Sequence, residues 1–184
     1  MKHLKKLEEY YNVPYPFPKL DHAETPTFKY GAMENWGLAI YLEKYFLHNA
    51  KTSQIIEQRI VSIITHEIAH MWFGNLVTPK WWDDLWLNEG FARYMEHIGT
   101  SLVRPKWDMY DQLVNLILGV IHADAAPKVR AISIDANTPE EIDAMVDPTI
   151  TYGKGSAIVR MINYILGEKT FNRALTAYFN KFCL

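Results

Sequence analysis

Cysteine is nearly absent from this sequence, since Cys183 is the only one among 184 residues. A single cysteine excludes an internal disulfide framework and leaves the cellular compartment open. Long hydrophobic runs are missing as well. The most apolar stretch, residues 113–121, is far shorter than the roughly 20 residues that span a bilayer, and no signal-type apolar segment follows Met1. We therefore expect a soluble chain without a membrane segment.

Charge of one sign does not accumulate either. The chain has 19 Lys and Arg against 21 Asp and Glu, scattered along its length, for a net charge of −2. This balance excludes the basic face that is typical of nucleic-acid-binding proteins. Apolar residues make up 49% of the chain and charged residues 22%, as in ordinary globular proteins, and no internal repeat is present. We expect one domain, or part of one, with a buried core and no nucleic-acid partner.

The most informative stretch is a His-Glu-x-x-His pattern at residues 66–70. On a helix, His66 and His70 stand one turn apart on the same face, so both imidazoles can reach one ion, while Glu67 points to the side. Ser53 is placed to cap this helix, and isoleucines at positions 56, 60, 63 and 64 recur at helical spacing. The pattern predicts a long, anchored helix that presents the geometry of a zinc site.

A third ligand follows in Glu89. The chain is expected to turn over residues 74–79, and Asp83 or Asp84 to cap a second helix over residues 85–98 that brings Glu89 back to the first. Two imidazoles and one carboxylate leave the fourth position of tetrahedral zinc for water, which is the catalytic arrangement. The alternative is that hydrogen bonds satisfy both histidines and that Glu89 is a solvated surface acid. That alternative requires the motif, the capped helix and the third ligand to coincide by chance.

The remaining pattern predicts a mostly α-helical α+β protein with a small β portion near the N-terminus. An amphipathic helix is expected over residues 3–12, and the run 38–42 has the length of a strand. A third helix should span residues 105–121, with Tyr110 on its buried face. A short strand is expected over 129–134, and further helices should begin at Thr138, near Gly155 and after Gly167.

Glu34 lies between Gly31 and Gly37 on a segment that is predicted to be extended. Glycine at both ends lets another backbone approach closely, which suits an edge strand that pairs with a peptide. A carboxylate at such a place could hold a cation. Taken alone, the stretch predicts only a strand with a turn.

Four ordered motifs can be compared with a known family. They are Gly31-Ala32-Met33-Glu34-Asn35, His66-Glu67-Ile68-Ala69-His70 with Glu89, the run from Trp81 to Ala92, and Tyr152-Gly153-Lys154-Gly155. Together they resemble the catalytic domain of the aminopeptidase N-like zinc aminopeptidases, from about Tyr11 to Phe182. The sequence departs from the family pattern at Thr27, Met71 and Gly153, where aspartate, glutamine and serine are usual. None of these departures removes a catalytic group.

The resemblance implies a thermolysin-like metallopeptidase fold and assigns a role to each motif. It implies that His66, His70 and Glu89 bind one Zn²⁺ per chain, that Glu67 is the general base, and that Tyr152 stabilises the transition state. It also implies that the substrate's amino end is held by Gly31, Ala32, Met33, Glu34 and Asn35. Family members carry further domains on both sides of this region, so residues 1–184 are expected to form a single, truncated catalytic domain. Without the resemblance, Tyr152 would be interpreted as a packed aromatic residue.

The expected function is that of a zinc metalloaminopeptidase, which hydrolyses the N-terminal peptide bond of peptides through a zinc-activated water. Its partners would be peptides with a free N-terminus. One alternative is a metalloendopeptidase of the same zinc chemistry, although Glu34 argues against it because a carboxylate can pair with a free α-amine. Another is an inactive truncated chain that binds peptide. The resemblance leaves the compartment, the oligomeric state and the preferred N-terminal residue open, because the family includes membrane-anchored ectoenzymes and cytosolic members.

Overall fold

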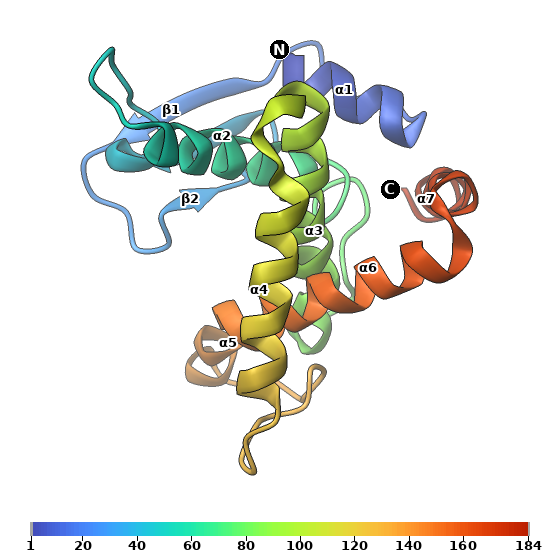
Figure 1. Ribbon diagram of the computed structural model, residues 1–184. Helices are drawn as coiled ribbons and strands as arrows, with labels where there is room; N and C mark the ends of the chain where they lie inside the picture. The colour runs from blue at the N-terminus through green and yellow to red at the C-terminus, as the bar shows by residue number, and fades with distance from the viewer. Residues whose placement is uncertain (1, 184) are drawn as a thin grey trace.

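The computed structural model describes residues 2–183 and is mostly helical, with one small sheet near the N-terminus, as predicted (Figure 1). The α-helices are α1 (Lys2–Tyr11), α2 (Gln54–Ala69), α3 (Leu85–Val103), α4 (Met109–Asp124), α5 (Pro139–Met145), α6 (Gly155–Leu166) and α7 (Glu168–Phe182). A π-helix, η4 (Pro148–Lys154), runs directly into α6. Short 3₁₀ turns are η1 (Glu43–Tyr45), η2 (Trp82–Asp84) and η3 (Pro105–Trp107).

The sheet has three strands in the order β1-β3-β2: β1 (Asp21–Thr25), β3 (Leu38–Leu42) and β2 (Ala32–Met33). Strand β3 pairs in parallel with β1, with Asp21 opposite Leu38, and antiparallel with β2, with Met33 opposite Ile40. Within residues 2–183, β2 is therefore an edge strand with one free side. The sequence does not predict β1, because its residues, Asp-His-Ala-Glu-Thr, lack an apolar alternation.

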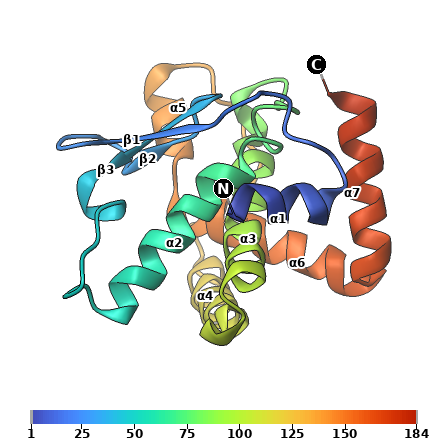
Figure 2. The same cartoon turned by 90° about the horizontal axis from the view of Figure 1, so that it is seen from above.

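Helices α2 and α3 pack against each other at the centre of the molecule. Figures 1 and 2 both show the sheet beside α2 at one end and helices α6 and α7 at the other. The end of α2 and the start of α3 thus lie between a sheet edge on one side and the η4–α6 segment on the other. This arrangement places side chains from four separate parts of the chain around one point.

The main core lies where α1, the turn after α2 and α7 meet. Tyr11, Trp72 and Phe179 are fully buried there, and the ring centroid of Tyr11 lies 5.0 Å from that of Trp72 and 5.3 Å from that of Phe179. Trp72 Nε1 also donates a hydrogen bond to the Val13 carbonyl at 3.1 Å. Burial of a large apolar side chain contributes about 1.5–3 kcal/mol. The turn that follows the His-Glu-x-x-His motif is therefore anchored in the core.

Two predicted helix caps are confirmed. Ser53 caps α2 by accepting a hydrogen bond from the Ile56 N–H, and Thr138 forms a capping box with Glu141 at the start of α5. Helix α2 ends at Ala69, before the predicted stop at 74, but the residue that follows keeps helical backbone angles and donates its N–H to the carbonyl one turn earlier. The two motif histidines therefore remain one turn apart.

Helix α3 begins at Leu85, as predicted, but differs from the prediction in its cap and in its end. It continues through Gly99 to Val103, and a Cβ at position 99 would lie 2.6 Å from Thr65 Cγ2. This glycine marks a close approach of α3 to α2 and does not end the helix. The predicted cap is not formed: Asp83 accepts a hydrogen bond from the loop before α5, and Asp84 makes no capping hydrogen bond.

The strand predicted over residues 129–134 does not form. The segment is irregular and pairs with no strand within residues 2–183, so its alternating pattern has no sheet to join. Its polar groups are used elsewhere, since the Arg130 guanidinium hydrogen-bonds to the Thr151 hydroxyl of η4. The alternation of apolar and polar residues is too short here to specify a strand without a partner.

Some apolar side chains of the helices stay exposed. Tyr110 of α4 is 45% exposed although it is predicted to be buried, and the buried side of α4 is formed by Met109, Leu113 and Val120. On α6, the apolar side chains of Met161 and Ile165 are both exposed. None of the helices within residues 2–183 combines the length and the apolar character needed to cross a membrane.

Candidate active site

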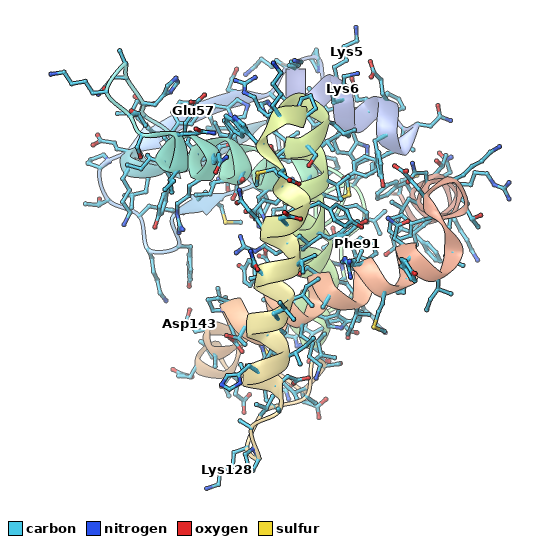
Figure 3. All side chains as sticks on the ribbon, viewed as in Figure 1. Lys5, Lys6, Glu57, Phe91, Lys128 and Asp143 are labelled. Atoms are coloured by element: carbon cyan, nitrogen blue, oxygen red, sulfur yellow. The ribbon has the colours of Figure 1, made fainter. Side chains whose placement is uncertain are left out.

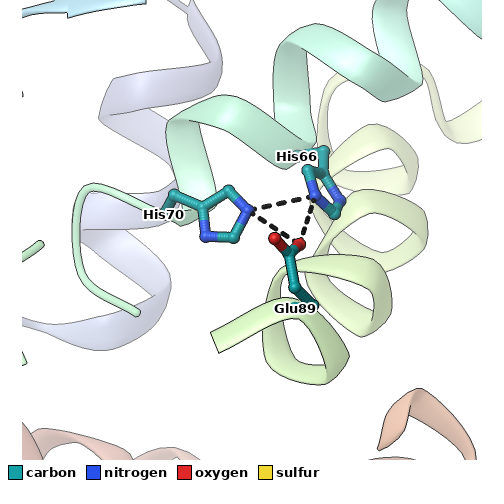
Figure 4. A group of neighbouring side chains, drawn as sticks. All are labelled: His66, His70 and Glu89. Carbon is teal, nitrogen blue, oxygen red and sulfur yellow. Dashed lines mark hydrogen bonds and ion pairs between the residues drawn. The ribbon is translucent and has the colours of Figure 1, made fainter. Parts of the chain in front are cut away.

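The two motif histidines and Glu89 form one buried cluster (Figure 4). His66 and His70 come from the end of α2, and Glu89 comes from the start of α3. The two Nε2 atoms lie 3.0 Å apart, and Glu89 Oε2 lies 3.2 Å from His66 Nε2 and 3.3 Å from His70 Nε2. The three residues predicted as metal ligands therefore direct one atom each toward a common point.

These distances fit a bound metal ion. Donor atoms that are about 2.0–2.1 Å from a tetrahedral ion lie about 3.3 Å from one another. His70 Nδ1 lies 2.9 Å from the Phe73 carbonyl and 2.7 Å from Asn88 Oδ1. Both of these oxygens are acceptors, so the ring proton belongs on Nδ1 and the Nε2 lone pair is free to bind a metal.

Glu96 of α3 supports His66 from behind. Its Oε2 lies 3.3 Å from His66 Nδ1 and 2.7 Å from Arg93 Nη1. A carboxylate in this place orients a metal-binding imidazole and makes it more basic. The sequence prediction omits Glu96, although its position seven residues after Glu89, two turns along the same helix face, is a signal that could have found it.

The charges of the cluster are strongly coupled. Burial alone would lower the pKa of His66, but the carboxylates of Glu89 and Glu96 outweigh it and raise that pKa to about 9. Burial would likewise raise the pKa of Glu89, but the two imidazoles hold it well below its usual range. Glu89 is therefore an anion, and a metal cation among the three donor atoms would take over the position of the imidazole protons.

Glu67 is buried beside the cluster. Within residues 2–183 its Oε2 has no hydrogen-bond partner, so this atom can accept a proton or a hydrogen bond from a further group. Burial raises the pKa of Glu67 to about 7, against the opposing effect of the nearby imidazoles. A carboxylate with a pKa near neutrality can both take up and return a proton.

The predicted substrate segment, residues 31–35, runs along the edge of the sheet. Gly31 turns the chain with a φ of 91°, Ala32 and Met33 form β2, and the Asn35 carbonyl accepts a hydrogen bond in the turn to β3. Glu34 reaches the cluster, with Oε1 3.6 Å from His70 Nδ1. Its backbone carbonyl accepts a hydrogen bond from Asn75 Nδ2 at 2.8 Å, which ties the segment to the turn after α2.

Asn88 joins the histidine cluster to this segment. Its Oδ1 lies 2.7 Å from His70 Nδ1, and its Nδ2 donates to Glu34 Oε1 at 3.3 Å. Gly74 makes room for the amide, because a Cβ there would collide with Asn88 Oδ1, and its φ of 115° disfavours any other residue. Asn88 belongs to the motif from Trp81 to Ala92, but the sequence does not indicate this bridging contact.

Tyr152 reaches the cluster from the π-helix η4. Its ring stacks on the His66 imidazole, with centroids 6.0 Å apart and an interplanar angle of 17°. Helix α3 and the η4–α6 segment approach through two glycines, since a Cβ at Gly90 would lie 2.7 Å from Gly155 Cα. Burial and the Glu89 carboxylate raise the pKa of Tyr152, so its hydroxyl stays protonated and can donate a hydrogen bond.

The sequence of this chain is similar to those of known peptidases. Residues 1–184 match the family described as the peptidase family M1 domain. Aminopeptidase N of Lactococcus lactis subsp. lactis is 43% identical over 177 residues, which cover 95% of this chain and 21% of that protein. Aminopeptidase N of Bos taurus is 43% identical over 178 residues, covering 94% and 18%. A leucyl aminopeptidase of Saccharolobus solfataricus is 42% identical over 176 residues, covering 95% and 22%, so the chain spans about a fifth of the length of these relatives.

Proposed function

Since the chain belongs to peptidase family M1, we propose that it carries the catalytic centre of a zinc metalloaminopeptidase, which hydrolyses the N-terminal peptide bond of peptides. The observation that carries this proposal is the position of Glu34. Its carboxylate lies 3.6 Å from His70, so a group that can bind an ammonium is next to a group that can bind a metal. We also infer that the chain forms one partial catalytic domain of the thermolysin-like type, in which a sheet edge lies beside the histidine helix.

The metal proposed for the cluster is Zn²⁺, one per chain, held by His66, His70 and Glu89. Two neutral imidazoles and one carboxylate are a ligand set that zinc favours, and they leave a fourth position for water or substrate. When bound, zinc would supply Lewis-acid chemistry, because it polarises a carbonyl group and lowers the pKa of water to about 7. Asn88 and Glu96 would orient the two imidazoles through their Nδ1 atoms.

Two further residues would serve the reacting bond. The Glu67 carboxylate takes a proton from the attacking water as the C–O bond forms, and it returns that proton to the departing amine as the C–N bond breaks. The Tyr152 hydroxyl donates a hydrogen bond to the carbonyl oxygen as negative charge develops there. A donor of this kind is worth about 10²–10³-fold in kcat.

The segment at residues 31–35 would determine which peptide bond is cut. Glu34 binds the substrate's free ammonium group, because a carboxylate in a site with little water is a strong partner for a cation. The free side of β2, with Ala32 and Met33, can pair with the backbone of the peptide, while Gly31 and Asn35 shape the turns at its two ends. The substrate class is therefore peptides with a free N-terminus.

Comparing an aminoacyl amide with its N-acetylated form tests this proposal. The zinc-loaded 184-residue chain should cut the free form and leave the acetylated one almost untouched. Glu34→Ala should reduce kcat/KM for the free form by about tenfold to a hundredfold, because hydrogen bonds to charged groups contribute about 1.5–3 kcal/mol. The exposed Glu43→Ala, in η1, is the matched control and should leave kcat/KM unchanged.

Each alternative function predicts a different outcome. A metalloendopeptidase would cut acetylated and internal bonds as readily as N-terminal ones, and Glu34→Ala would not alter that ratio. A chain that binds peptide without turnover would take up zinc and bind the amide but release no product. Either result would replace the aminopeptidase assignment.

A further inference from the structure

We propose that Arg130 is a positioning residue for Tyr152: its guanidinium ties the loop after α4 to the π-helix η4 and so holds the tyrosine hydroxyl at the histidine cluster. The inference rests on the proposed function, in which Tyr152 donates to the reacting carbonyl. Arg130 lies two residues beyond Lys128, which marks the exposed tip of that loop (Figure 3). No sequence motif includes Arg130. It lies in the segment 129–134, which the sequence predicts to be a strand.

Arg130 contacts η4 and the residue that caps it. Its Nη2 donates to Thr151 Oγ1 at 2.5 Å and lies 3.5 Å from Asp147 Oδ2. Thr151 is fully buried, and its hydroxyl donates in turn to the Met145 carbonyl at 2.6 Å. The residue immediately before Tyr152 is therefore held from the α5 side by one hydrogen bond and from the α4 loop by another.

Asp147 completes the network at the start of η4. Its Oδ1 accepts a hydrogen bond from the Thr149 N–H at 2.8 Å, and its Oδ2 faces Arg130. One carboxylate oxygen therefore caps the π-helix, and the other forms the ion pair with the Arg130 guanidinium. The guanidinium uses Nη2 for Thr151 and Asp147 and donates from Nη1 to the Ala131 carbonyl at 3.1 Å. A lysine could not serve these three acceptors in the same way, because its ammonium is a single point charge whereas the guanidinium presents several donors in one plane.

The π-helix needs such support. This conformation is rare and usually short, and it is found most often at functional sites. The Tyr152 N–H reaches the Asp147 carbonyl at 3.4 Å, at the long end of the range for a hydrogen bond. The Tyr152 carbonyl accepts from the Gly155 N–H, so the long bond is on the N-terminal side of Tyr152, where the side-chain network around Thr151 adds a second constraint.

A double-mutant cycle separates positioning from folding. Arg130→Met should lower kcat by about tenfold to a hundredfold, since a misplacement of 1 Å can reduce a rate by about 10². KM and zinc content should stay within about twofold, because Glu34 and the metal ligands lie on other elements. In a Tyr152→Phe background, Arg130→Met should then change kcat by less than about twofold, because the hydroxyl it positions is gone. Lys128→Met, on the same loop, is the matched control and should change nothing.

Two results for Arg130→Met would overturn the inference. One is an unchanged kcat in Arg130→Met, and another is a full additional loss in the Tyr152→Phe background, which would mean a general structural role. If Arg130→Met does not fold, Arg130→Lys is carried through the same cycle, where a partial and non-additive loss of kcat supports the inference and an additive loss overturns it. If Tyr152→Phe itself leaves kcat unchanged, the proposed role of Tyr152 fails, and this inference fails with it. A large effect of Tyr152→Phe without an effect of Arg130→Met refutes only the inference.

Discussion

Replacing Gly90 with alanine would drive a methyl group into the backbone of another helix. The added Cβ would lie 2.7 Å from Gly155 Cα and 2.8 Å from the Gly155 carbonyl carbon. Neither atom can rotate away, so α3 and the η4–α6 segment must separate. Overpacking of this kind typically costs about 1–3 kcal/mol. Alanine also favours a helix over glycine by about 1 kcal/mol, and a control must remove that contribution.

Gly119→Ala supplies the control. Gly119 lies within α4, and a Cβ there would meet no atom within 4 Å. This variant should therefore gain the helical preference alone, about 0.5–1 kcal/mol. The free energies of unfolding of the two variants should differ by about 1–3 kcal/mol, which corresponds to about 2–12 °C in Tm for a chain of this length.

Thermal unfolding and kcat of the zinc-loaded chain are the measurements. Gly90 follows Glu89, and Gly155 is three residues from Tyr152, so separation of the helices should move the tyrosine hydroxyl away from the cluster. We expect kcat of Gly90→Ala to fall by about 10²-fold if the shift reaches 1 Å, while Gly119→Ala keeps full activity. If Gly90→Ala is as stable and as active as Gly119→Ala, the two helices do not pack backbone to backbone.

Three further predictions concern the metal cluster. His70→Ala should lose stoichiometric zinc, whereas Glu67→Gln should keep zinc and lose about 10²–10⁴-fold in activity. Metal analysis and turnover are measured on the same preparations. Full zinc retention by His70→Ala would remove that histidine from the site. Glu96→Gln should weaken zinc binding by about 10–100-fold in competition with a chelator, and an unchanged affinity would make its approach to His66 incidental. Zinc affinity should rise as the pH increases from 7 towards 9, because the pKa of His66 is raised to about 9 and its imidazole is protonated in the metal-free chain. The increase should be up to about tenfold per pH unit for each proton that zinc displaces. Calorimetric titration in two buffers of different ionisation enthalpy measures the released protons, and no release at pH 7 would contradict the assignment.

Much of the candidate metal site could be predicted because its determinants are local. The spacing of His66 and His70 needs only one helical turn, and the Ser53 cap that starts this helix is also a local feature. Glu89 required a second helix to fold back, and the turn and periodicity predicted that helix and its start at residue 85, although its cap and its end were wrong. The edge strand before Glu34 followed from glycines on either side of a short apolar run.

Contacts between distant parts of the chain could not be predicted in the same way. Without the family resemblance, Tyr152 would not have been placed at the cluster, because a π-helix and a pair of packed glycines bring it there. Gly99 was expected to follow a helix, since the packing of α2 against α3 is not visible in local sequence. Arg130 was expected to lie in a strand, and its partners are 17 and 21 positions away. Such side-chain networks depend on tertiary structure, and a period of two or 3.6 residues carries no information about them.

The Asn88 amide sets the distance between His70 and Glu34. One end of this small planar group hydrogen-bonds to His70 and the other to Glu34, so a single side chain sets the spacing between the carboxylate and the imidazole. If an ammonium group binds Glu34, the site selects substrates by the distance from that nitrogen to the first carbonyl carbon. This distance does not depend on the side chain of the first residue. If Glu34 binds the ammonium as proposed, a β-amino acid, whose amine stands one carbon further from its carbonyl, would exceed that distance, and its first peptide bond would lie beyond His66, His70 and Glu89.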